Sequence, residues 1–257
     1  MNTKWTCATA AVAGARHLRA ARNGQDAVGA WLGADAAAVV VCDGCGSGAG
    51  SELGARLGAQ LVLGALARRL GRGAAAGDAD LWRAVRAECG AALAALLETF
   101  AGDREAAVRD GFLFTVVAAA VTRDEVAVWA LGDGAYALGS ASARVLGPFA
   151  DNAPPYLAYD LVGEPGAAEL VVVPASCGSV VIATDGAVDL IGDDAPAPVL
   201  AAFAAPALAR PDALRRHLAL LARSGERIDW EARRVVRAPA RLQDDCAVAA
   251  LRWELPS

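Results

Sequence analysis

Three apolar segments of this chain each end in an aspartate followed by a glycine. They read VVVCDG at Asp43, VWALGDG at Asp133 and VVIATDG at Asp185. Continuous runs of valine, isoleucine and alanine are typical of strands buried on both faces. In each segment the aspartate therefore lies where a buried strand leaves the core. The glycine after it has no side chain that could cover the carboxylate. A chain that repeats this arrangement is expected to collect acidic groups at its strand ends.

Two further aspartates occupy comparable positions. Asp26 closes the sequence NGQD just before a predicted strand, and Asp245 closes QDD just before the last strand. Any one Asp-Gly pair is usually only a turn, because both residues tolerate turn geometry. Five carboxylates in one partly dry site would resist ionisation, so either arginines or metal ions must neutralise them. Oxygen ligands in a chain with only two histidines favour magnesium or manganese over zinc or copper.

The hydrophobic periodicity predicts strands in two blocks around a pair of long helices. The predicted helices span 51–70 and 79–99, with a further helical region at 197–224 that is interrupted near Pro206 and Pro211. We expect 148–168 to be a surface excursion and 225–243 to be irregular. The predicted strands are 4–15, 27–32, 36–42, 112–122, 125–131, 135–139, 144–146, 169–173, 179–183 and 246–253.

This order of elements indicates an α+β fold in which helices pack against sheets. The sequence has no internal repeat and no low-complexity linker. At 257 residues the chain is long enough for one large core. We therefore expect a single domain over residues 1–257.

Charge and cysteine content exclude several classes of partner. The net charge of -5 and the pI of about 5.1 argue against nucleic acid, whose phosphates such a surface would repel. Six irregularly spaced cysteines do not form a disulfide framework, and Cys42 and Cys45 have no second pair with which to build a zinc site. Reduced thiols predict a cytoplasmic protein.

The start of the chain imitates a weak signal peptide, with Lys4 before an apolar run that ends in Ala13-Gly14-Ala15. The run is mostly alanine and threonine, which makes a poor hydrophobic region, and a first β-strand explains it better. No apolar run reaches the roughly 18 residues that span a bilayer. We therefore expect no membrane association.

In their order along the chain, these motifs resemble those of the metal-dependent protein phosphatases of type 2C, the PPM family. The likeness is greatest to a bacterial branch and runs from about residue 8 to 253. The segment GARHLRAARNGQDA resembles the first motif of that branch, with His17 nine residues before Asp26. The other matching segments are VCDGCGSGAGSELGARLGAQLV, FLFTVVAAAV with VWALGDGAYAL, VVIATDGAVDL and LQDDCAVAAL.

The resemblance implies a four-layer α-β-β-α sandwich, in which two antiparallel sheets are flanked by helix pairs. This fold needs residues 4–15 as a core strand, so cleavage of that segment as a signal peptide would destroy the domain. The excursion at 148–168 corresponds to the family's variable flap beside the site, which would tune the choice of substrate.

The resemblance also implies a metal site with two manganese or magnesium ions. Asp43 would bridge the two ions and the Gly44 carbonyl would bind one of them. Asp185 and Asp245 would complete the shell of the first ion, and Asp26 would support the second, directly or through water. Asp133 matches a position that helps to hold a third, weaker ion in bacterial relatives.

The implied activity is hydrolysis of phosphoserine and phosphothreonine in proteins, opposed by a cognate Ser/Thr kinase, and we expect a monomer. A pair of divalent ions lowers the pKa of a shared water toward neutrality, so no protein nucleophile is needed. An arginine would stabilise the phosphoryl oxygens.

The phosphate-binding arginine and the proton donor of the family have no counterpart at the matching positions of this chain. Arg22 is the nearest arginine in sequence, with Arg16 and Arg19 as alternatives, but relatives often carry theirs five residues before the aspartate, where this chain has Ala21. Cys45 stands where many relatives have a histidine proposed as general acid. Water or His17 would then protonate the leaving group, although a purely structural hydrogen bond explains His17 equally well.

Two other classes of function remain to be compared. GCGSGAG, after a strand and before a helix, mimics a dinucleotide-binding loop, but no acidic residue closes a second strand about 20 residues later. A catalytically weak or inactive relative could instead act as a phosphoprotein-binding module. The presence of all five carboxylates argues against that alternative, because a binding module has no need of them.

Overall fold

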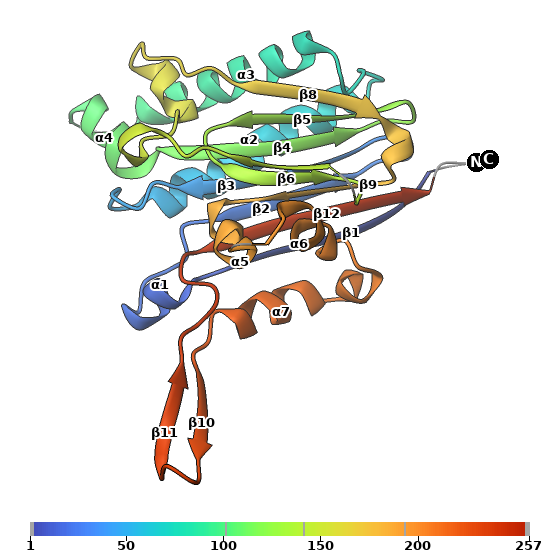
Figure 1. Ribbon diagram of the computed structural model, residues 1–257. Helices are drawn as coiled ribbons and strands as arrows, with labels where there is room; N and C mark the ends of the chain where they lie inside the picture. Colours follow the sequence, from blue (N-terminus) through green and yellow to red (C-terminus); the bar gives the residue numbers. More distant parts are fainter. Residues whose placement is uncertain (1–2, 101, 141, 193, 255–257) are drawn as a thin grey trace.

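Ten strands of the computed structural model, which describes residues 3–100, 102–140, 142–192 and 194–254, form two five-stranded antiparallel sheets (Figure 1). One sheet has the order β1 (Lys4–Val12), β12 (Cys246–Glu254), β9 (Ser179–Ala183), β6 (Gly134–Leu138) and β7 (Ser142–Leu146). The other has the order β2 (Ala27–Leu32), β3 (Ala37–Gly44), β4 (Phe114–Val121), β5 (Glu125–Leu131) and β8 (Glu169–Pro174). The two sheets pack face to face.

Helices cover the outer face of each sheet (Figure 1). The second sheet packs against α2 (Ser51–Leu70) and α3 (Ala79–Leu97), with α4 (Arg104–Gly111) at one end. The first sheet packs against α5 (Val188–Ile191), α6 (Pro196–Ala202) and α7 (Ala213–Leu221). The predicted α-β-β-α sandwich is therefore confirmed.

Strand β3 explains why the fold needs continuous apolar sequence. Val40 and Cys42 point into the core beneath α2, while Val39 and Val41 point into the core between the sheets. Both faces are buried because successive side chains of a strand alternate between the two layers. A polar residue on either face would lose its hydration, so the run of valines is a direct consequence of the four-layer arrangement.

Helix α2 lies close to β4 because small residues face the sheet. A Cβ atom at Gly58 would stand 2.2 Å from the Phe114 ring, and one at Gly54 would stand 2.3 Å from the Gly111 carbonyl oxygen. Neither position has room for a side chain. These glycines therefore set the distance between helix and sheet, at a cost in helix propensity.

The first and last parts of the chain are adjacent strands. β1 pairs with β12 along its whole length, from Lys4 opposite Glu254 to Val12 opposite Cys246. The segment that imitates a signal peptide is thus a strand, as predicted. It ends at Val12 rather than at residue 15, because the backbone N–H groups of Ala15 and Arg16 donate to Leu242 and Gln243 and start the short helix α1 (Ala15–Arg19).

Three regions differ from the prediction. Helix α4 had no predicted counterpart. The 225–243 segment, predicted to be irregular, contains a hairpin of β10 (Gly225–Asp229) and β11 (Arg234–Ala238) that projects from the sandwich (Figure 1). The 148–168 excursion is not confined to the surface, since Tyr156, Leu157 and Ala158 are buried in the core beneath α2 and α3.

Short 3₁₀ turns complete the described chain: η1 (Ala150–Asn152), η2 (Leu157–Leu161), η3 (Ala175–Cys177), η4 (Asp185–Ala187) and η5 (Pro206–Ala209). Within the residues that the structure describes, no helix combines the length and the hydropathy required to cross a lipid bilayer.

The contact between α2 and β4 gives a matched test of the packing. We expect Gly58→Ala to lower the free energy of unfolding, because overpacking against Phe114 costs about 1–3 kcal/mol, more than the roughly 1 kcal/mol that alanine gains in a helix. Gly64→Ala, on the same helix, would contact only the mobile end of Arg68 and should raise it by about 0.5–1 kcal/mol. Urea denaturation measures both changes, and a stabilising Gly58→Ala would contradict the packing described.

Candidate metal centre

The ends of five strands meet at one end of the sandwich. Asp43 lies at the end of β3, opposite Thr115 of β4, and Asp185 follows β9 by two residues. Asp133 and Asp245 immediately precede β6 and β12, the two neighbours of β9. Because neighbouring strands run antiparallel, the end of one strand lies beside the beginning of the next. The predicted convergence of aspartates from distant parts of the sequence follows from this register.

A cavity of about 140 Å³ opens where these strand ends meet. No arginine, lysine or histidine belongs to its lining within the described ranges. The cavity is therefore strongly acidic, and almost all of the ligand atoms that it offers are oxygens. Its lining residues are Gln25, Asp43, Gly44, Cys45, Gly46, Thr115, Asp133, Pro154, Tyr156, Asp185, Asp244 and Asp245.

Asp26 stands behind this cavity and is 7% exposed. Its carboxyl group lies close enough to that of Asp43 for each to influence the pKa of the other, and the Thr184 hydroxyl donates to its Oδ2 atom over 2.5 Å. The Thr184 oxygen in turn accepts the backbone N–H of Ala247 over 2.8 Å. Asp26 is thus held by a hydroxyl that follows β9 and lies beside a carboxyl group of β3.

Asp245 links the last strand to the N-terminal loop. Its Oδ1 accepts the Gly14 N–H over 2.8 Å, and its Oδ2 accepts the Gln25 N–H over 2.6 Å. His17 Nδ1 lies 2.6 Å from the same Oδ2, at the edge of the site. Three of the roughly four lone-pair sites of this carboxylate are used, which leaves it room for one more partner.

Burial and mutual repulsion raise the pKa values of these carboxyl groups. Loss of hydration raises the pKa of Asp26 to about 7 and that of Asp185 to about 6, and neighbouring carboxylates add to both shifts. The pKa of Asp43 lies well above its usual range, mainly through burial and then through the charges of Asp26 and Asp185. Burial likewise raises the pKa of Asp133. Negative charge is therefore costly here unless a cation compensates it.

The residues present fit a hard divalent cation. Among the described residues, the Oδ1 atoms of Asp26 and Asp133 are buried and have no hydrogen-bond partner, so they are available as ligands. The remaining donors are carboxylates, a hydroxyl and backbone carbonyls, the ligands that magnesium and manganese prefer. As the side chains stand, no three acidic, histidine or cysteine groups in the described ranges converge on one point. Binding an ion therefore requires small rotations of the aspartates.

The basic residues named from the sequence lie outside the cavity. Arg22 is exposed, and its side chain makes no hydrogen bond or ion pair with any residue that the structure describes. Arg16 is closer, with its Nη1 3.6 Å from Oδ2 of Asp244 at the cavity wall. Arg19 lies on the same short helix, 3.5 Å from the Gln243 side chain. The assignment of Arg22 to phosphate binding stays a prediction.

Several buried polar residues of the site were not identified from the sequence. Gln25 donates to the Ser51 hydroxyl over 2.6 Å and so ties the loop before β2 to the start of α2. Thr115 and Thr184 are polar residues within or directly after apolar strands, which is the one signal that could have drawn attention to them. Tyr156 comes from the excursion between β7 and β8 and closes one side of the cavity.

The fold is that of bacterial phosphatases whose structures have been solved. The chain is similar to the catalytic domain of the serine/threonine protein phosphatase PstP in complex with two manganese ions, with 20% identity and a TM-score of 0.57 over 98% of this chain and 99% of the other. Stp1 from Staphylococcus aureus matches with 15% identity and a TM-score of 0.61 over 99% and 97%. PppA, a regulatory component of the type VI secretion system in Pseudomonas aeruginosa, matches with 18% identity and a TM-score of 0.60 over 98% and 100%.

Sequence comparison gives the family. The family model of protein phosphatase 2C matches residues 13–221, which is most of the chain. The protein therefore belongs to the protein phosphatase 2C family of metal-dependent protein serine/threonine phosphatases, and the predicted membership of the PPM family is confirmed. No curated protein matches the chain.

The raised pKa values predict how the metal-free protein responds to pH. A group that binds its proton more tightly in the folded state stabilises that state at low pH, and this contribution is lost as pH rises through the folded pKa. The melting temperature of chelator-treated protein should therefore fall as pH rises from about 4 through about 7.

Asp43→Asn should raise the melting temperature of the metal-free protein at pH 8, because it removes one of the repelling charges. Asp124→Asn, an exposed change at the β4–β5 turn, serves as the control and should leave it unchanged. A lower melting temperature for Asp43→Asn at pH 8 would mean that these carboxylates do not repel one another.

Proposed function

We propose that this protein hydrolyses phosphomonoesters on the serine and threonine residues of phosphorylated proteins, using two manganese or magnesium ions. The observation that carries the proposal is the meeting of Asp43, Asp133, Asp185 and Asp245, from separate strand ends, around one small cavity, with Asp26 beside Asp43 behind it, in a chain of the protein phosphatase 2C family. The family relationship supports the reaction, and the acidic cavity supports its dependence on metal.

Asp43, Asp185, Asp245 and the Gly44 carbonyl would hold the first ion, and Asp43 with Asp26 the second. Asp133 would support a third, weaker ion through its unpartnered Oδ1. Bound divalent ions supply a water of near-neutral pKa as the nucleophile and neutralise charge on the phosphoryl oxygens. The PstP catalytic domain, which is similar in fold, was solved with two manganese ions.

Electrostatics supports this assignment independently of the family. A phosphate monoester is an anion, and carboxylates alone would repel it from the cavity. No cationic side chain in the lining described above offsets that repulsion. Cations bound by the aspartates would reverse the sign of the local field, so that the same group of residues attracts phosphate.

The size of the cavity limits what can enter it. A volume of about 140 Å³ accommodates a phosphoryl group with a few waters, since a water molecule occupies about 30 Å³ in the liquid. A phosphorylated side chain would therefore reach in from the surface while its protein stays outside. Tyr156 and Pro154, from the excursion between β7 and β8, would contact the entering side chain.

Within this proposal, the surrounding hydrogen bonds orient the ligands. Thr184 fixes Oδ2 of Asp26, and His17 with two backbone N–H groups fixes Asp245. Such outer contacts commonly change metal affinity 10–100-fold when they are removed. Arg16 lies outside the cavity but pairs with Asp244 of its wall, and it is the guanidinium best placed to reach the phosphoryl oxygens, with Arg22 as the alternative.

We further propose that residues 1–257 form one domain that acts as a monomer in the cytoplasm, in opposition to a Ser/Thr kinase. The shared core between the two sheets supports a single domain. Six free cysteines are compatible with a reducing compartment.

The proposed reaction depends on metal and on the central aspartates. We expect p-nitrophenyl phosphate to be hydrolysed with manganese or magnesium and not after chelation. Asp185→Asn should reduce the turnover rate at least about 100-fold, because it removes a ligand charge where the phosphoryl group is attacked. Asp124→Asn, at the exposed turn between β4 and β5, is the control that should retain most activity.

Circular dichroism of the Asp185→Asn variant should match that of the wild type. Unchanged turnover would remove Asp185 from the site. Binding of manganese without any turnover by the wild type would favour a phosphoprotein-binding module instead.

The role of His17 can be tested by changing the leaving group. p-Nitrophenolate leaves without a proton, whereas the serine alkoxide needs one. If His17 donates that proton, His17→Asn lowers kcat on a phosphoserine peptide and spares p-nitrophenyl phosphate. We expect instead that both substrates lose activity together and that excess manganese restores part of it, because His17 is bonded to Asp245. Selective loss on the peptide would identify His17 as the general acid.

A further inference from the structure

The loop between α1 and β2 carries the only asparagine of this chain that is followed by glycine, Asn23-Gly24. The other two asparagines precede Thr3 and Ala153. An Asn-Gly pair is chemically labile, because the glycine nitrogen can attack the side-chain amide of the asparagine and no Cβ atom restricts its approach. The pair lies directly before Gln25, a residue that borders the acidic cavity.

Hydrogen bonds anchor the chain on both sides of this pair but not within it. The N–H of Arg22 donates to a carbonyl oxygen of α1 over 3.0 Å, and the N–H of Gln25 donates to Oδ2 of Asp245 over 2.6 Å. Between these two anchors, the N–H groups of Asn23 and Gly24 have no hydrogen-bond partner in the described ranges. The glycine nitrogen is therefore free to turn toward the asparagine side chain.

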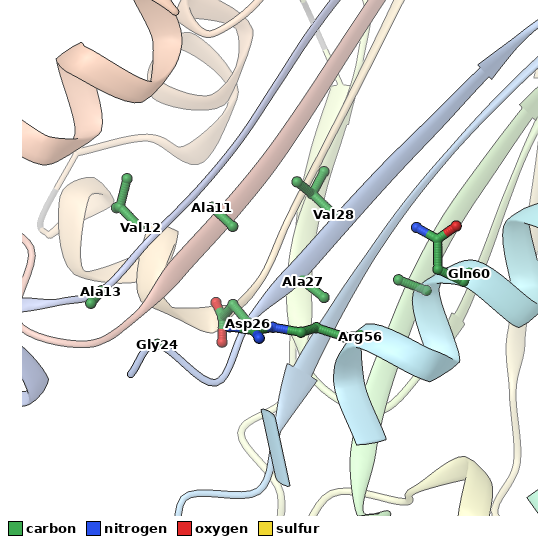
Figure 2. A pocket seen from close by; sticks show the side chains of 10 residues that line it. Ala11, Val12, Ala13, Gly24, Asp26, Ala27, Val28, Arg56 and Gln60 are labelled. Carbon is green, nitrogen blue, oxygen red and sulfur yellow. The ribbon is translucent and has the colours of Figure 1, made fainter. Parts of the chain in front are cut away.

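The asparagine side chain is also unrestrained, and there is space beside the glycine. Asn23 is exposed, and its amide makes no hydrogen bond with any residue that the structure describes. Gly24 lines a second and larger cavity of about 470 Å³ between the end of β1, the beginning of β2 and α2, which Asp26 and Arg56 also line (Figure 2). A Cβ atom at Gly24 would stand 3.4 Å from the nearest atoms of Ala13, an ordinary contact distance. A ring formed at this point would therefore not meet a tightly packed neighbour.

Asn152 provides a contrast within the same chain. It is followed by Ala153, whose Cβ atom restricts the backbone. The N–H of Ala153 already donates to the Ala150 carbonyl oxygen over 3.0 Å, so attack by this nitrogen would require that bond to break. The two asparagines therefore differ in both properties that ring closure needs, a free N–H group and an unhindered backbone.

We propose that Asn23 is a site of spontaneous deamidation and isomerisation, with water as the co-reactant. The Gly24 nitrogen attacks the carbonyl carbon of the Asn23 side chain, the new carbon–nitrogen bond closes a cyclic imide, and ammonia leaves with the proton of the Gly24 N–H. Water then opens the imide and restores that N–H. Opening at one carbonyl group gives aspartate, and opening at the other gives isoaspartate, whose main chain is longer by one methylene group. Overall, one water is consumed and one ammonia is released.

The modification reaches the acidic cavity through Gln25. This residue is anchored twice, by its N–H to Asp245 and by its side chain to the Ser51 hydroxyl, over 2.6 Å in each case. Isoaspartate at position 23 lengthens the main chain just before this double anchor, so the bond to Asp245 weakens. Loss of such an outer contact commonly changes metal affinity about 10–100-fold. The effect on metal rests on the proposed function, whereas the chemical step does not.

Mass spectrometry of the metal-free full chain tests the chemical step. After incubation at pH 8, the peptide 23–56 should show replacement of the amide at residue 23 by a carboxylate, while the peptide that contains Asn152 keeps its amide. Gly24→Ala, whose Cβ atom has room beside Ala13, should slow the loss of the amide at least about tenfold. An Asn23 amide that lasts as long as that of Asn152 would overturn the proposal. This comparison is made within the wild-type chain, so it decides the question even if the variant fails to fold.

The melting temperature of the metal-free protein tests the effect on the Gln25 anchor. Incubated wild-type protein should melt below fresh protein, whereas incubated Gly24→Ala protein should melt like its own fresh sample. Asn23→Asp introduces the charge without the extra methylene group and should melt like fresh wild-type protein. An unchanged melting temperature of fully modified protein would contradict the link between Asn23 and the cavity.

Manganese titration extends this test to the proposed metal centre. Incubated wild-type protein should bind manganese at least about tenfold more weakly than fresh protein. Equal affinities would contradict the effect on metal. Failure of fresh protein to bind manganese would count against the proposed function alone, because loss of the amide and the melting temperature are both measured without metal.

Discussion

Repulsion between buried carboxylates is the constraint on which this structure depends. Two sheets in register bring the ends of β3, β9, β6 and β12 together, and each of them delivers an aspartate to the same small volume. Burial prevents water from screening these charges, and the pKa values of Asp26, Asp43 and Asp185 are raised in consequence. The apolar strands hold the carboxylates in place, so the energetic cost falls on a part of the molecule that cannot relax by unfolding locally.

That cost is understandable if the cavity is a cation site. Groups that destabilise the metal-free protein become ligands once positive charge is present, and the outer hydrogen bonds from Thr184 and His17 keep them oriented in either state. Asp26 lies between two cavities. It neighbours Asp43 of the acidic cavity, and it also lines the larger cavity beside Arg56.

Much of the fold could be predicted from the sequence because it rests on hydrophobic pattern. The bounds of α2 and of β2, β5 and β9 agree with the prediction, and so does the double-sided burial of β3. The β10–β11 hairpin could not be predicted in this way, because almost all of its residues are exposed and no apolar alternation marks its strands. The burial of Tyr156 depends on where the long excursion packs, which local sequence does not encode.

The candidate site, like the fold, could be predicted from the sequence only in part. The aspartates stood out because Asp-Gly at the end of an apolar strand is a local pattern. Gln25 and Thr184 act through partners 26 and 158 residues away, so their roles appear only once the sheets are in register. The arginine expected from the family pattern had no clear counterpart, and the structure leaves Arg22 exposed while Arg16 pairs with Asp244 of the cavity wall.

The most direct measurement is anomalous diffraction at the manganese edge from crystals of the protein grown with manganese. We expect two strong peaks in the acidic cavity, the first within ligand distance of Asp43 and Asp185 and the second shared between Asp43 and Asp26. A cavity that stays free of anomalous density at saturating manganese would contradict the central claim.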